Sequence, residues 1–218
     1  MGLVKVSEAS LRRVAPEPTT RPSSPAAFVQ GYPGALSPQV CDDIVARFEA
    51  DPRRYPSRTA TRQNPLIRSG TMLDIPRYED WADVCSLVTQ VTRRCLDDYV
   101  QRYPSLQFLA RPENSLITPP IIERIEPGQG YGYHVDAGAS GTHDRIVSGL
   151  FYLRDVAEGG ETEFPFQVMH VKPRAGLLLM FPPFWTHLHR GVSPVSAVKY
   201  NITNFVILRP PPPRAAAS

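Results

Sequence analysis

The second half of the chain is a succession of short apolar segments separated by glycine and proline, and this pattern limits the folds open to it. From residue 117 onward, eight segments rich in β-branched and aromatic residues follow one another. They span residues 121–126, 131–135, 146–153, 162–164, 169–172, 177–181, 185–189 and 200–208. Strands this short, with turn residues between them, are typical of a β-sandwich or β-barrel.

The first half carries two helical patterns instead. Ser37 followed by Pro38 is typical of an N-cap and a first helical position, and apolar residues then recur at helical spacing until residue 51. A longer helix is predicted over about 79–103. Its apolar stripe comprises Val84, Val88, Val91, Cys95 and Tyr99. We expect both helices to brace one sheet of the barrel.

Composition bounds the class of protein. A chain of 218 residues with a hydrophobic fraction of 42% suffices for one domain with short appendages. The net charge of +3 is too small to indicate a nucleic-acid partner. No run of 18 apolar residues and no apolar signal core is present, so we expect a cytoplasmic protein without a membrane span. The three cysteines have no C-x-x-C spacing and are interpreted as reduced, packed thiols.

The domain boundaries follow from changes in composition. Residues 1–26 are rich in Pro, Ser, Thr and Arg and lack periodicity, which predicts a flexible N-terminal arm. Residues 27–208 are predicted to form a single domain, helical over about 27–112 and β-rich over about 113–208. Residues 209–218 form a Pro-rich tail of polyproline II character. The tail is interpreted as an exposed terminus or, alternatively, as a ligand for proline-reading modules.

A candidate metal site lies within the β-rich half. His134 and Asp136 are two residues apart on a predicted strand, so their side chains point to the same side. Downstream, His187 and His189 also share one face of the predicted strand 185–189. Two histidines and one carboxylate that leave three coordination positions open are the arrangement of non-haem iron(II) oxygenases. Lys199 follows ten residues after His189 and suggests an anchor for an anionic co-substrate.

These residues belong to a longer set of motifs in a fixed order. The set comprises Pro127-Gly128, His134-x-Asp136, Phe151-Tyr152-Leu153, 159–165, 171–176, Phe181, His189-Arg190-Gly191, Pro194-Val195 and Lys199-Tyr200. Over roughly the last hundred residues, the chain resembles the iron(II)/2-oxoglutarate-dependent dioxygenases, most closely the prolyl-4-hydroxylase-like branch. The resemblance implies an all-β core with flanking helices, in the form of a double-stranded β-helix, or jelly-roll.

The resemblance also implies a cofactor and its ligands. It assigns Fe(II) to His134, Asp136 and His189, with 2-oxoglutarate and O2 as co-substrates and ascorbate as a supporting reductant. The family spacing of about ten residues from the third ligand to the basic residue favours His189. His187 would give a spacing of twelve and is then expected either to support a metal ligand from outside the coordination sphere or to line the pocket. An aspartate at position 136 leaves no vacancy for a halide, which favours oxygen insertion over halogenation.

Several further residues are implied to hold the co-substrate. The resemblance assigns Lys199 to the distal carboxylate of 2-oxoglutarate. Tyr152 and Thr162 match positions whose hydroxyl groups contact the same carboxylate in the resembling hydroxylases, although barrel packing alone would also account for them. Thr203 lies four residues beyond Lys199, on the same strand face, and is a fourth candidate.

Other positions depart from the family pattern or match it weakly. Ile125 stands where many relatives carry a tyrosine, and Phe205 stands where a tryptophan is common. Arg145 matches a substrate-contacting arginine of peptidyl-proline hydroxylases, but a solvated or cap-pairing arginine fits equally well. His143 and His170 match no motif and are interpreted as structural.

The predicted activity is hydroxylation of an unactivated C–H bond in an amino acid or a specialised small molecule. Hydroxylation of proline or another residue within a peptide or protein is the alternative, which Arg145 and the branch resemblance favour. A non-catalytic metal-binding jelly-roll, or an adaptor acting through the Pro-rich tail, is a third possibility. The intact anchor Lys199 argues against that third possibility. Neither nucleic acid nor membrane is expected as a partner, and the sequence leaves the oligomeric state open.

Overall fold

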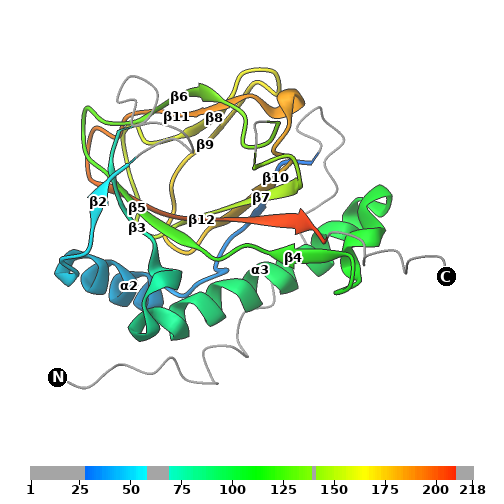
Figure 1. Ribbon diagram of the computed structural model, residues 1–218. Helices are drawn as coiled ribbons and strands as arrows, with labels where there is room; N and C mark the ends of the chain where they lie inside the picture. The colour runs from blue at the N-terminus through cyan, green and yellow to red at the C-terminus, as the bar shows by residue number, and fades with distance from the viewer. Residues whose placement is uncertain (1–27, 58–68, 139–140, 210–218) are drawn as a thin grey trace.

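The computed structural model describes residues 28–57, 69–138 and 141–209. Two antiparallel sheets face each other across a barrel interior, and helices cover the outer side of one sheet (Figure 1). This arrangement confirms the predicted jelly-roll with flanking helices. The predicted arm, residues 1–26, lies outside the described residues, and so does the predicted tail apart from Arg209.

Eight strands form the major sheet and four form the minor sheet, and every pair of neighbouring strands is antiparallel. The major sheet runs in the order β1 (Gln30–Tyr32), β10 (Leu178–Phe181), β7 (Arg145–Tyr152), β12 (Lys199–Leu208), β5 (Ile121–Ile125), β3 (Thr71–Leu73) and β2 (Tyr55–Pro56), with β4 (Ser115–Ile117) paired to β12. The minor sheet runs in the order β6 (Tyr131–His134), β11 (His189–Gly191), β8 (Thr162–Phe164) and β9 (Met169–Val171).

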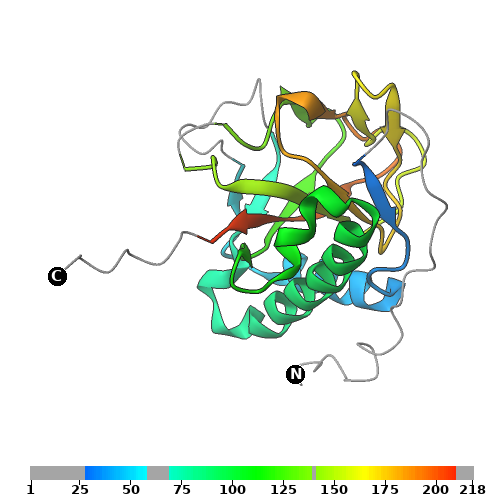
Figure 2. The same cartoon turned by 90° about the vertical axis from the view of Figure 1, so that its right-hand side faces the viewer.

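The helices brace the major sheet, as the sequence predicts. Helix α2 (Pro38–Ala50) begins at Ser37, whose hydroxyl oxygen accepts a hydrogen bond from the backbone N–H of Val40 at 3.3 Å. The predicted helix 79–103 is a short 3-10 turn followed by α3 (Ala82–Arg102). Figures 1 and 2 show both helices against the outer face of the major sheet. Three further 3-10 segments are η1 (Ile75–Arg77), η3 (Pro104–Ala110) and η4 (Trp185–His187).

Strand alternation divides the side chains of the major sheet between two layers. Tyr200, Ile202 and Val206 on β12 pack into the hydrophobic cluster shared with α2 and α3. The intervening residues of β12 therefore face the barrel interior, and these include Lys199, Asn201 and Thr203. A smaller apolar cluster lies on the interior side. Its buried members are Val29, Tyr152, Phe164, Leu179 and Phe181. The interior thus combines an apolar lining with a few polar positions.

Seven of the eight predicted strands are present, with ends that differ by at most one residue. The predicted strand 185–189 is wrong over its first four residues, since β11 begins only at His189. There the chain forms the 3-10 turn η4, in which the backbone N–H of His187 donates to the carbonyl of Phe184 at 2.8 Å. Pro182 and Pro183 end β10 because proline has no N–H to donate to a sheet. Since η4 is a turn, His187 and His189 do not share a strand face.

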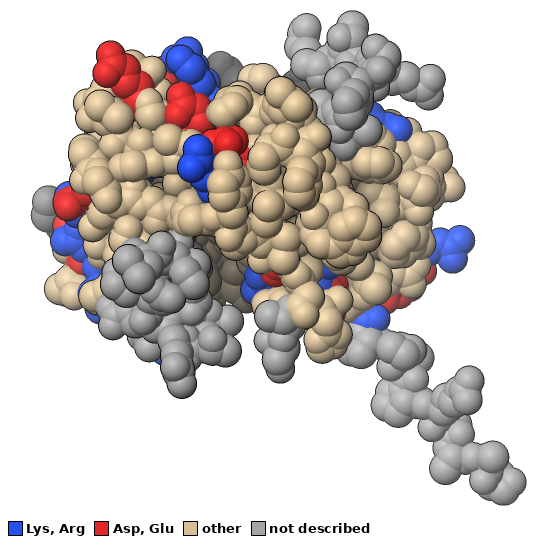
Figure 3. All heavy atoms as spheres, turned by 90° about the horizontal axis from the view of Figure 1, so that it is seen from above, with Lys and Arg blue, Asp and Glu red and all other residues tan. Residues whose placement is uncertain are grey.

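The outer face of the minor sheet is polar and carries charges of both signs. Across β6, β8 and β11, the hydroxyl of Tyr133 donates to Glu163 at 2.6 Å and the guanidinium of Arg190 donates to the same carboxylate at 2.7 Å. Figure 3 views this face and shows acidic and basic side chains next to each other instead of a patch of one sign. Among the described helices, none is long and apolar enough to cross a membrane.

Candidate active site

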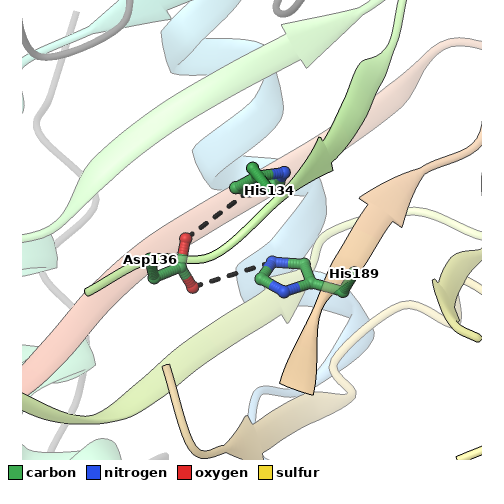
Figure 4. A group of neighbouring side chains, drawn as sticks. All are labelled: His134, Asp136 and His189. Carbon is green, nitrogen blue, oxygen red and sulfur yellow. Dashed lines mark ion pairs between the residues drawn. The ribbon is translucent and has the colours of Figure 1, made fainter. Parts of the chain in front are cut away.

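His134, Asp136 and His189 meet at one end of the barrel interior. His134 is the last residue of β6, Asp136 follows two residues later, and His189 opens the neighbouring strand β11 directly opposite His134. The Nε2 atoms of His134 and His189 lie 3.5 and 3.7 Å from the two carboxylate oxygens of Asp136. The three side chains point toward one another (Figure 4). One donor atom from each lies within 4.8 Å of the other two, as a shared metal ion requires.

Each imidazole is oriented by a backbone carbonyl two residues before it. His134 Nδ1 lies 2.9 Å from the carbonyl oxygen of Gly132, and His189 Nδ1 lies 3.0 Å from that of His187. A carbonyl only accepts, so Nδ1 of each ring carries a proton, and in the neutral ring Nε2 is the atom with a lone pair for a metal. Metal-binding histidines are usually oriented in this way.

Burial and charge give the cluster the protonation states that a metal site needs. Burial favours a raised pKa for Asp136, but His134 and His189 outweigh it and hold that pKa below its usual value. Burial also lowers the pKa of His189 to about 4, against the opposing effect of Asp136. Asp136 is therefore ionised and His189 neutral near pH 7, so both can donate to a cation.

A buried cation lies deeper in the same interior. Lys199, the first residue of β12, is only 2% exposed, and its ammonium nitrogen lies 5.4 Å from the centroid of the Tyr152 ring. Within the described part of the chain, no carboxylate lies within 4.0 Å of that nitrogen. A buried, unpaired ammonium is costly. The arrangement therefore fits a site whose anion arrives with a ligand.

Tyr152 and Thr162 join the two sheets beside Lys199. Their hydroxyl oxygens lie 2.6 Å apart, and both side chains are buried. Tyr152 comes from β7 in the major sheet and Thr162 from β8 in the minor sheet. The pair places two hydroxyl groups in the interior, close to the ammonium of Lys199.

Comparison with known proteins connects this geometry to a family. The model of the 2OG-Fe(II) oxygenase superfamily matches residues 121–207, which contain all of the site residues named above. A PKHD-type hydroxylase of Hyphomonas neptunium is 32% identical over 124 residues. The aligned region covers 53% of each protein, so the chain spans about half the length of this relative. Residues 121–207, which form the site, are therefore similar to the 2OG-Fe(II) oxygenase superfamily.

Solved structures support the fold. A viral collagen prolyl hydroxylase from Paramecium Bursaria Chlorella virus-1, in complex with 2OG, matches with a TM-score of 0.60 at 18% identity. The match covers 87% of this chain and 100% of the viral protein. A Trichoplax adhaerens prolyl hydroxylase, in complex with a hypoxia inducible factor peptide, matches with a TM-score of 0.66 at 18% identity over 83% of each chain.

Thr203 and Arg145, the remaining predicted site residues, lie in different surroundings. Thr203 is half-buried on the interior face of β12, opposite Leu150 of β7. Arg145 donates to the backbone carbonyl of Asp136 at 2.9 Å, and its guanidinium stacks on Phe205 at 3.6 Å from the ring centroid. Arg145 therefore supports the segment that carries Asp136. A substrate contact by Arg145 stays a prediction.

His187 and His189, the two candidates for the third metal ligand, lie in different surroundings. His187 is buried in η4, where its Nδ1 lies 2.9 Å from the hydroxyl oxygen of Thr186. The cluster formed by described residues contains His189 and not His187. His187 contributes its backbone carbonyl, which orients the ring of His189.

Two buried polar residues of the interior were not among the predicted site residues. Ser148 on β7 donates a hydrogen bond from its hydroxyl to Asp136 at 2.6 Å. Asn201 on β12 is 2% exposed, and its side-chain oxygen has no hydrogen-bond partner among the described residues. The sequence could have placed both on the interior face, because residues an even number apart on a strand point to the same side. Ser148 lies four residues before Tyr152, and Asn201 lies two residues after Lys199.

Proposed function

We propose that this chain is an Fe(II)- and 2-oxoglutarate-dependent hydroxylase of an unactivated C–H bond. The observation that carries the proposal is the pairing of two features in one barrel interior. One is the His134, Asp136 and His189 cluster. The other is the buried ammonium of Lys199, which has no carboxylate partner in the part of the chain that the structure describes. The first fits a divalent metal and the second fits the carboxylate of an anionic co-substrate.

The residues present fit both groups. Two imidazole nitrogens and one carboxylate oxygen would hold Fe(II) from one side and leave its other positions open to co-substrate and O2. When bound, Fe(II) with 2-oxoglutarate supplies the oxidising capacity that places one oxygen atom of O2 in the product and the other in succinate. The protein supplies binding, orientation and shielding.

Different residues of the chain would bind the co-substrate and exclude water. Lys199 would pair with the distal carboxylate of 2-oxoglutarate, and the Tyr152 and Thr162 hydroxyls would donate to the same group. Thr203, on the same interior face as Lys199, would lie along the co-substrate. The apolar cluster that includes Phe164 and Phe181 keeps bulk water away from the bound groups.

Two substrate classes remain in the proposal. An amino acid or specialised small molecule is the class proposed from the sequence. Proline, or another residue within a polypeptide, is the second. The relatives named as prolyl hydroxylases favour the second class. The exposed indole of Trp185 also favours it, because Trp185 is 79% exposed in η4, close in sequence to His189, where an extended substrate could contact it.

The proposal predicts substrate-dependent release of succinate. The purified chain should be supplied with Fe(II), 2-oxoglutarate and air, and screened against free amino acids, small metabolites and proline-containing peptides. Succinate should rise above the uncoupled background with at least one class, and the product should be heavier by one oxygen atom. The Asp136→Ala variant is the background control. If only peptides raised succinate release, the second substrate class would be assigned. If no tested compound raised it, the result would contradict the hydroxylase proposal.

The surroundings of Lys199 also predict a pH dependence. Burial lowers the pKa of Lys199 to about 7, although Glu161 opposes the shift. The ammonium form binds the carboxylate, so above pH 7 binding must take up a proton. The affinity for 2-oxoglutarate should therefore fall by roughly tenfold between pH 7 and pH 8.5. Equilibrium titration of the Mn(II)-loaded protein measures it. The arginine of Lys199→Arg stays charged in this range, so the affinity of this variant for 2-oxoglutarate should depend little on pH. If the affinity of the unchanged chain were equally independent of pH, the assignment of Lys199 as the anchor would be contradicted.

A further inference from the structure

Asp136 lies outside regular secondary structure, and its main chain is held from two directions. The backbone N–H groups of Asp136 and Ala137 both donate to the carbonyl of Pro183 at 3.0 Å, and Arg145 donates to the carbonyl of Asp136 at 2.9 Å. These bonds place the Cα atom of Asp136. They leave its carboxylate free to rotate, so another contact must fix the two oxygens.

Ser148 makes that contact. Its hydroxyl donates to Oδ2 of Asp136 at 2.6 Å. Oδ1 lies 3.5 Å from His134 Nε2 and accepts no bond from Ser148, whereas Oδ2 also lies 3.7 Å from His189 Nε2. Ser148 is 1% exposed and pairs with Phe181 on one side and Phe205 on the other. A hydroxyl buried between aromatic neighbours needs a polar partner, and a hydrogen bond to a carboxylate is stronger than one between neutral groups.

We propose that Ser148 is a positioning residue that occupies Oδ2 of Asp136 and thereby presents Oδ1 to the metal. The inference rests on the proposed function, since it assumes a metal at the cluster. With Oδ2 engaged by Ser148, Asp136 would hold a metal through Oδ1 and would leave room for co-substrate and O2. Neither family resemblance nor strand pattern assigns this role to Ser148; it follows from the hydrogen bond and from burial.

The test measures metal affinity and needs neither substrate nor turnover. Mn(II) is the probe, and the free ion is counted by electron paramagnetic resonance in a titration of the full chain. Ser148→Ala should bind Mn(II) about 10 to 100 times more weakly, which is the usual loss when the partner of a ligand is removed. Ser115→Ala is the matched control, because Ser115 is also 1% exposed and bonds through its hydroxyl to Leu109, at the far end of β12. Its affinity should equal that of the unchanged chain.

A second pair of variants isolates the hydroxyl if Ser148→Ala folds poorly. Ser148→Thr and Ser148→Val have nearly the same shape and differ in one hydroxyl group. Thr should keep the affinity within about threefold and Val should lose it as Ala does. Equal affinities for Thr and Val, or an Ala variant that binds like the unchanged chain, would overturn the role of Ser148 alone. An unchanged chain that binds no Mn(II) would refute the proposed function and this inference with it.

Discussion

Replacing His134, Asp136 or His189 by alanine is expected to abolish formation of the iron–co-substrate complex. Each change removes one of three donor atoms that lie within 4.8 Å of one another. Loss of a hydrogen-bond partner of a ligand already costs 10 to 100 times in metal affinity, so loss of a ligand should cost at least about a hundredfold. The measurement is the charge-transfer absorption that forms when Fe(II) and 2-oxoglutarate are added without oxygen. None of the three variants should show this absorption at Fe(II) and 2-oxoglutarate concentrations that saturate the unchanged chain.

Two other histidines are controls for this experiment. His170→Ala alters an exposed residue of β9, outside the cluster, and should leave the absorption unchanged. His187→Ala keeps the backbone carbonyl that orients His189 and should retain most of it. If His187→Ala removed the absorption while His189→Ala preserved it, the assignment of the third ligand would be wrong.

Lys199→Ala is expected to weaken 2-oxoglutarate binding by at least about a hundredfold. The substitution leaves the distal carboxylate of the co-substrate in a buried site without its cation. Breaking one side of a buried ion pair costs roughly 3–5 kcal/mol. About 1.4 kcal/mol corresponds to a tenfold change, so the lower figure already gives the hundredfold loss. Metal affinity should change little, because Lys199 is not among the cluster residues. The apparent KM for 2-oxoglutarate in succinate release, with iron content checked in parallel, measures the effect.

Two variants are controls for Lys199→Ala: one removes a surface lysine, and the other keeps the positive charge at position 199. Lys172→Ala changes an exposed lysine beyond β9 and should leave the KM unaltered. Lys199→Arg should be tolerated better than alanine, although the wider guanidinium needs more room. An unchanged KM in Lys199→Ala would refute the anchor. Arg190 and Arg174 would then be poor substitutes, since Arg190 pairs with Glu163 on the outer face and Arg174 is exposed beside Asp155.

The sequence was most informative where period-two alternation continues without interruption. The strand-forming runs around His134 and Lys199 had clear boundaries, and their interior faces followed from counting residues. The same counting failed at 185–189. Two prolines before that stretch end the strand, and η4 replaces alternation with a turn. His189 still joins the cluster, because β11 begins at that residue.

The interior polar contacts were harder to predict, because they join segments far apart in the chain. Ser148 and Asp136 are brought together by the packing of β7 against the loop after β6. Arg145 bonds to Asp136 through the same packing. Single-strand periodicity shows which face a residue occupies and not which residue lies opposite, so such pairs appear only in three dimensions. The short strands β1 to β4 were missed because two or three residues carry no measurable alternation and, unlike β8, these strands lie outside the motifs.

The most direct test of the central claim is an anaerobic titration of the unchanged chain with Fe(II) and then with 2-oxoglutarate. We expect one equivalent of Fe(II) to bind, and a visible charge-transfer absorption to form on addition of 2-oxoglutarate and to saturate at one equivalent. Succinate should produce no such band, since it lacks the keto group that chelates iron. A chain that binds no Fe(II), or that binds Fe(II) and develops no absorption with 2-oxoglutarate, would contradict the account.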